Sequence, residues 1–219
     1  MISLKKISFT LLLFICCSVT AEAVEDTEAR LFHAATEGKH IEVENIIKRG
    51  TDPNLTNENG HTAIFYAAAS GHIKTVESLV ELGADLNLTD KDGNTPLVMA
   101  ASNKGDYKMV QKLLSLGANP NYINKDGMTA VHLAAMMGHY EIVVTLMSYE
   151  AFVNIQSRSG YTPLMMASLK GHDKIVRVLL SNGAYDIPNM RGQTALMLAK
   201  EKEHVGVVRL LELQNRVLS

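Results

Sequence analysis

The sequence of 219 residues predicts an all-α solenoid of about six stacked helix–turn–helix units. Three observations lead to this fold class. Glycines recur in three series with a common period, short apolar phrases recur in step with them, and the units at both ends are more polar than those between. A fixed period over most of a chain is typical of repeat proteins, in which each unit buries its apolar face against its neighbours.

The glycine series define the units. The first series is spaced by 32 to 34 residues, at positions 60, 93, 127, 160 and 192. The second stands at 38, 71, 105, 138 and 171, and the third at 50, 83, 117 and 183, with Glu150 where a further glycine would fall. They divide the chain into units at approximately 27–59, 60–92, 93–126, 127–159, 160–191 and 192–219.

Each unit after the first has, as its third residue, a threonine that predicts the start of a short helix. A threonine hydroxyl can accept a hydrogen bond from the first helical turn, and proline fits the first helical position, where its missing N–H has no partner to lose. Pro96 and Pro163 follow two of these threonines. The predicted capping residues are Thr62, Thr95, Thr129, Thr162 and Thr194.

The rest of each unit predicts a close-packed helix pair. Alanine pairs at 67–68, 100–101 and 134–135 let neighbouring first helices approach closely. A glycine such as Gly138 can adopt the left-handed conformation that ends this helix. The second helix then carries apolar positions, such as Ile142, Val143 and Leu146, that face the stack.

The end units predict capping repeats. In the first unit, Arg30 and His33 occupy positions that are apolar in the inner units, and the last unit carries charges at 200–203. A terminal repeat needs a polar outer face because no neighbour covers it.

The recurring phrases resemble the ankyrin repeat family over residues 27–214. "GHTAIFYAAASGHIKTVESLVELGADLN" and "GMTAVHLAAMMGHYEIVVTLMSYEAFVN" follow its pattern G-x-T-P-L-H-L-A-A, then G-H, then G-A-D-x-N. The resemblance implies projecting β-hairpin loops and a concave surface, made of hairpin tips and first helices, that binds a partner protein. It also implies that His132 hydrogen-bonds locally and braces its turn.

The N-terminal segment 1–23 predicts a secretory signal peptide. Lys5 and Lys6 precede an apolar run from Ile7 to about Val19, and Ala21-Glu22-Ala23 has the form that signal peptidase accepts. The run is shorter than the roughly 20 residues of a membrane-spanning helix. We therefore expect cleavage after Ala23 and a mature repeat domain at 24–219, without membrane insertion.

Removal of this segment would change the chemistry open to the protein. It would take away Cys16 and Cys17, the two cysteines of the sequence, and would change the formal net charge from −2 to −3. A disulfide-free exported chain suits a bacterial periplasm better than an animal extracellular space, although full secretion also remains open. Charges are interspersed, which argues against nucleic acid as a partner.

No motif indicates catalysis, a cofactor or a metal site. The sequence has no G-x-S-x-G, no P-loop lysine motif and no H-E-x-x-H, and its eight histidines lack the spacing of a zinc helix. Four of them fit structural positions of the repeat: His72, His132, His139 and His172. We therefore expect a non-catalytic, monomeric protein without cofactors.

Binding is the remaining function, and the variable positions of the repeat predict where it occurs. Apolar residues at these positions cluster in the units 127–159 and 160–191, and two basic residues flank them at the hairpin tips. The predicted partner-binding residues are Met128, Met136, Met137, Tyr161, Leu169, Lys125 and Arg158. The leading interpretation is a protein-interaction module. An inhibitor or immunity protein acting on an envelope enzyme or toxin, and a stress-protective envelope factor, remain alternatives that an adjacent toxin or stress gene would favour.

Overall fold

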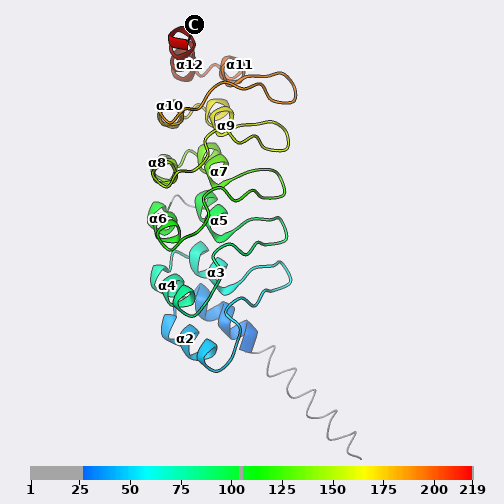
Figure 1. Cartoon of the computed structure of the whole chain (residues 1–219), viewed down its shortest axis with the longest axis vertical. Coiled ribbons are helices and arrows are strands. Elements are labelled where there is room, and N and C mark those ends of the chain that lie inside the picture. The colour runs from blue at the N-terminus through cyan, green and yellow to red at the C-terminus, as the bar shows by residue number, and fades with distance from the viewer. Residues whose placement is uncertain (1–26, 104–105, 219) are drawn as a thin grey trace, which may run out of the picture.

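The computed structural model describes residues 27–103 and 106–218, in which helices alternate between an inner and an outer layer (Figure 1). The inner helices are residues 27–36, α3 (Ala63–Ala69), α5 (Pro96–Ser102), α7 (Ala130–Met137), α9 (Pro163–Lys170) and α11 (Ala195–Glu201). The outer helices are α2 (His40–Lys48), α4 (Ile73–Glu81), α6 (Tyr107–Ser115), α8 (Tyr140–Ser148), α10 (Asp173–Ser181) and α12 (Val205–Leu218). The predicted all-α solenoid is confirmed; the segment 1–23 lies outside the described residues.

The helix pairs stack into an elongated column, and the loops that connect one pair to the next project to one side (Figure 1). Each inner helix packs against the next, and the alanine pairs occupy these contacts: Ala67, Ala101 and Ala134 are fully buried. Val143 and Leu146 of α8 are also fully buried. Small side chains between inner helices and larger ones between the layers thus give a continuous core along the column.

Three of the five predicted caps form through the threonine hydroxyl, and Thr62 lacks its cap. The hydroxyls of Thr95, Thr162 and Thr194 accept hydrogen bonds from backbone N–H groups three residues later, at 3.2–3.3 Å. Thr62 stands at the start of α3, but its hydroxyl oxygen is buried without a partner. The reason is that the N–H of Phe65, from which the hydroxyl would accept a hydrogen bond, donates instead to the backbone carbonyl of Thr62 at 3.1 Å.

Gly138 shows why a glycine ends the inner helix. Its φ of 81° lies in the left-handed region, as predicted. A Cβ at this position would also stand 2.7 Å from the ring of His172 in the next unit. That ring hydrogen-bonds to the carbonyl oxygen of Met136 at 3.3 Å. The glycine therefore serves both the turn and the contact between adjacent units.

Glu150 keeps the backbone turn of the glycine that it replaces. Its φ is 58°, in the left-handed region, where the equivalent Gly183 has a φ of 83°. Glu203, two residues after the end of α11, is a second non-glycine residue in this region, with a φ of 56°.

The connecting loops form tight hairpins without regular strands within the described residues. Each closes through two backbone hydrogen bonds of 2.8–3.0 Å, such as those from the N–H of Asn124 to the carbonyl of Met128 and from the N–H of Gly127 to the carbonyl of Asn124. Neighbouring hairpins are also bonded to each other, since the N–H of Arg158 donates to the carbonyl of Asp126 at 2.8 Å. A Cβ on Gly127 would lie 2.6 Å from this N–H, so the hairpins can approach closely only because glycine stands there.

Candidate binding surface

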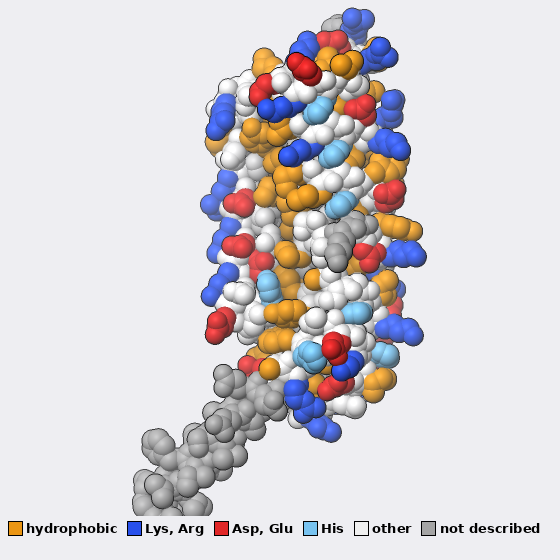
Figure 2. All heavy atoms as spheres, turned by 180° about the vertical axis from the view of Figure 1, so that it is seen from behind, with side chains coloured by type: hydrophobic (Ala, Val, Ile, Leu, Met, Phe, Trp, Pro, Cys, Tyr) orange, Lys and Arg blue, Asp and Glu red, His pale blue; other side chains and the backbone are white. Residues whose placement is uncertain are grey.

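Hydrophobic side chains form a stripe along one face of the column, between the charged edge of the hairpins and a column of histidines (Figure 2). We call this the inner face; it comprises the hairpin tips and the accessible side of the inner helices. Half-buried Tyr66, Met136, Met166 and Leu169 belong to the inner helices and pack against the core with part of their surface. The stripe is therefore anchored in the scaffold while its outer surface stays open.

The inner face is hollowed between the units 127–159 and 160–191. A depression of about 370 Å³, which we call the apolar hollow, opens there. Met128 and Tyr161 each follow a hairpin glycine, whereas Met166 and Leu169 come from α9. The complete lining is Asp126, Met128, Ser157, Arg158, Ser159, Tyr161, Met166 and Leu169.

The structure brings four of the seven predicted site residues together in this hollow: Met128, Arg158, Tyr161 and Leu169. The other three lie outside its lining. Met136 is half-buried against the core, while Met137, at the end of α7, is 49% exposed. The ammonium group of Lys125 hydrogen-bonds to the carbonyl oxygen of Lys91 on the preceding hairpin. That these residues bind a partner stays a prediction.

Residues that the sequence analysis did not select also line the hollow. Met166 is the main one, because it adds an apolar wall from the middle of α9. The repeat holds Tyr66, Met99 and Leu133 at the equivalent positions. This variation among large apolar side chains is the sequence signal that could have identified Met166 as a site residue. Asp126, Ser157 and Ser159 are hairpin residues, and only the folding of adjacent hairpins together places them at the hollow.

His132 braces the hollow from inside the protein. Its Nδ1 accepts a hydrogen bond from the N–H of Thr129 at 3.1 Å, and its Nε2 lies 3.1 Å from the carbonyl oxygen of Tyr161. This arrangement requires a neutral ring with its proton on Nε2. Burial lowers the pKa of His132 to about 4, although hydrogen bonds to the carbonyls of Tyr161 and Ile155 oppose the shift. The local role that the family pattern implies for this histidine is confirmed.

Polar side chains shape the hairpin that forms one rim of the hollow. The side-chain oxygen of Asn124, which is buried, accepts hydrogen bonds from the N–H groups of Asp126 at 3.0 Å and Met128 at 2.9 Å. The side-chain amide of Asn124 donates to Asn94 of the preceding hairpin at 2.9 Å. Met128 is therefore held by a satisfied buried network, which fixes its position beside the hollow.

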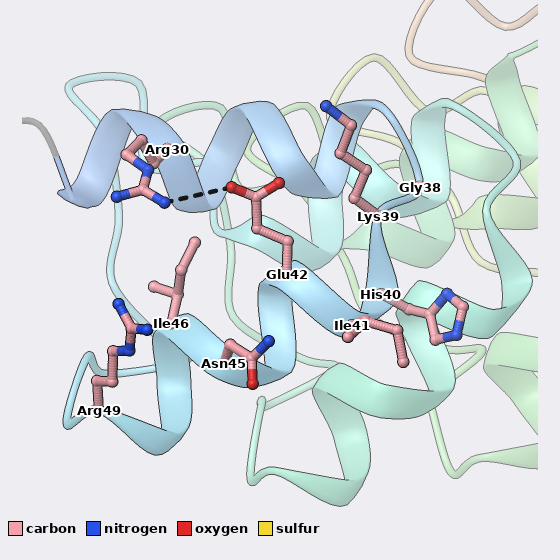
Figure 3. A pocket seen from close by; sticks show the side chains of 9 residues that line it. All are labelled: Arg30, Gly38, Lys39, His40, Ile41, Glu42, Asn45, Ile46 and Arg49. Carbon is pink, nitrogen blue, oxygen red and sulfur yellow. Dashed lines mark hydrogen bonds and ion pairs between the residues drawn. The ribbon is translucent and has the colours of Figure 1, made fainter.

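A second hollow, of about 580 Å³, lies at the N-terminal end of the column (Figure 3). Arg30 and Glu42 form an ion pair of 3.4 Å across it, above the side chain of Ile46. Glu42 stands where α8 has the buried Ile142. A charge thus replaces an apolar contact at the point where the column has no preceding repeat. This hollow therefore belongs to the solvent-exposed face of the capping first repeat.

Among residues 27–103 and 106–218, no group of three or more histidine, cysteine or acidic side chains is placed to hold a metal ion. Over the same part of the chain, no helix is both long and apolar enough to cross a membrane.

The chain belongs to the ankyrin repeat family. The family model described as ankyrin repeats (3 copies) matches residues 31–124 and 99–189, which together cover most of the sequence. Ankyrin repeats are generally protein–protein interaction modules and are typically non-catalytic. A comparison with curated proteins finds no match.

Proposed function

We propose that this ankyrin repeat protein is a non-catalytic binding protein that holds a partner protein on its inner face. The observation that carries the proposal is the apolar hollow, where half-buried Met128, Tyr161, Met166 and Leu169 from two adjacent units meet on an open surface. Methionine and aromatic side chains are suitable anchors because they bury a large area, and methionine adapts to the shape of its partner. Met137, at the exposed end of α7, lies outside this lining, and its part in the binding surface is a prediction.

The test is a comparison of two double variants with similar side-chain losses. Met137→Ala with Tyr161→Ala removes apolar surface from the inner face. Tyr140→Ala with Val144→Ala removes it from α8 on the outer layer, where these residues are 37% and 41% exposed. The partner is first captured from an envelope extract with the wild-type protein, and its affinity for each variant is then measured by calorimetry.

We expect the inner-face pair to weaken the complex by about 2 kcal/mol or more, and the α8 pair to leave it unchanged. Thermal unfolding of the free variants separates contact from packing, because an interface residue changes binding more than stability. A large stability loss in the inner-face variant would return these residues to the core. Equal affinities for the two variants would place the binding surface elsewhere.

We also propose export to the periplasm, on the basis of the pattern in residues 1–23. Lys5, Lys6, the short apolar run and the Ala21-Glu22-Ala23 site support it. The expected product is a mature chain beginning near Val24. N-terminal sequencing of the protein from fractionated cells tests this expectation, and an intact Met1 on a cytoplasmic protein would reject it.

A further inference from the structure

The hairpin tips of the column change charge from one end to the other. Two residues stand at each tip. Their summed formal charge is −1 at the first tip in the chain, zero at the next two, and +1 at the last two. In chain order the tip pairs are Glu58-Asn59, Lys91-Asp92, Lys125-Asp126, Arg158-Ser159 and Met190-Arg191. The basic tips are those at and beyond the apolar hollow.

Backbone hydrogen bonds hold these tips in one row. The N–H groups of Lys91, Lys125 and Arg158 each donate to a carbonyl of the preceding tip at 2.8–3.0 Å, and that of Met190 does so at 3.4 Å. The last of these bonds joins Met190 to Ser159, a residue that lines the hollow. Arg191 therefore follows directly after a contact with the rim of the hollow.

The inner helix beside the hollow adds a further positive charge. Lys170 ends α9, directly after Leu169, which lines the hollow. Arg158, Lys170 and Arg191 are exposed, and none of them forms an ion pair within residues 27–103 and 106–218. Asp126 is the carboxylate of the lining. At the equivalent tip and helix positions nearer the N-terminus, Glu58, Ser70 and Asp92 carry no positive charge.

We propose that the inner face takes a partner segment in which an apolar anchor is flanked on one side by acidic residues. The anchor occupies the apolar hollow, and the acidic residues lie over Arg158, Lys170 and Arg191. This proposal rests on the proposed function and adds the chemistry of the partner to it. Opposite charges at the rim of an interface raise the association rate and select against partners of the wrong charge. Because the charge changes along the row, it also fixes the direction in which the segment lies.

The experiment uses a random linear peptide library panned against the protein, so that the sequence of the ligand is an outcome. Enriched peptides are tested on two triple variants with the same change in charge. Arg158→Glu, Lys170→Glu and Arg191→Glu alter the rim of the hollow. As a control, Lys74→Glu, Lys108→Glu and Lys174→Glu alter three exposed lysines of the outer helices α4, α6 and α10. Circular dichroism confirms that both variants fold.

We expect the enriched peptides to combine aspartate or glutamate with leucine, methionine or an aromatic residue. The rim variant should bind them about tenfold or more weakly than the wild type at about 0.1 M salt, and the control should bind them as the wild type does. Added salt should lower the affinity of the wild type for these peptides. Replacing the apolar residues of a peptide by alanine should also abolish binding.

Three outcomes would overturn the inference. They are enrichment of basic or uncharged peptides, equal binding by the two triple variants, and tight binding of acidic peptides after their apolar residues are removed. The double variant Met137→Ala with Tyr161→Ala then shows whether the proposed function fails as well. If this variant binds the enriched peptides more weakly than the wild type does, whatever their charge, the inner face remains the binding surface and only the proposed partner chemistry is wrong. If it leaves them unchanged, the evidence counts against both proposals.

Discussion

Acidification should destabilise the protein through His132, and His132→Met should remove that part of the pH dependence. The side chain is fully buried, and burial lowers its pKa from an ordinary value of 6.5 to about 4. Between these two values the unfolded chain binds a proton that the folded chain does not. The free energy of unfolding therefore falls as the pH falls from about 6.5 towards 4, and the contribution of the neutral ring is complete above this window.

The size of the effect follows from the difference between the two pKa values. One pKa unit corresponds to about 1.4 kcal/mol, so the full difference of about 2.5 units is worth about 3 kcal/mol. Between pH 7 and pH 5.5, where few carboxylates titrate, the expected loss from His132 is about 1 kcal/mol. This loss is large enough to measure by urea unfolding.

The assay compares urea unfolding of the wild type and the variant at pH 7 and pH 5.5. Methionine fits the site because Val98 and Met165 occupy the equivalent position in neighbouring units and are buried. A His33→Gln variant serves as the control, since the side chain of His33 is 66% exposed. We expect the stability difference between the two pH values to shrink by about 1 kcal/mol in His132→Met only. The same difference in wild type and His132→Met would refute the reasoning.

Two further predictions concern residues in the left-handed conformation. Glu150→Gly should raise the free energy of unfolding by about 1 kcal/mol, because glycine adopts this conformation without a steric cost, and Glu203→Gly offers a second position with a similar φ. Urea unfolding that shows no gain at Glu150 would contradict the expected strain. Gly138→Ala should destabilise the protein by about 2 kcal/mol, since its methyl group would meet the ring of His172 in addition to the unfavourable φ. A thermal melt indistinguishable from the wild type would show that the ring shifts freely.

The local rules of the repeat could be read from the sequence because each depends on one or two residue types. Pro96 and Pro163 stand at helix starts, and Gly138 ends its helix in the left-handed conformation, as the pattern predicts. Thr62 shows the limit of such reading. Like Thr194, it is followed by alanine, but the bond from Phe65 to its backbone carbonyl leaves its hydroxyl without the cap that Thr194 forms. That choice depends on the detailed geometry of the first turn.

The candidate site was predictable only in part. Variable positions after the hairpin glycines pointed to Met128 and Tyr161, and both line the hollow. Met137 was expected to join them in one patch, but the hollow lies between α9 and two hairpins, and the end of α7 is not part of its lining. Which variable residues meet depends on the offset between adjacent units, and that offset is set by packing across the whole interface. A one-dimensional repeat pattern does not contain it.

The hydrogen bonds between neighbouring hairpin tips also make the cooperativity of the column measurable. The amide protons of Lys91, Lys125 and Arg158 are each bonded to a carbonyl of the preceding hairpin. Such a proton exchanges with solvent when the two hairpins separate. If the column opens as one body, the three amides exchange with a single free energy of opening. If it frays from its ends, as a chain of nearest-neighbour contacts can, Lys125 in the middle exchanges most slowly.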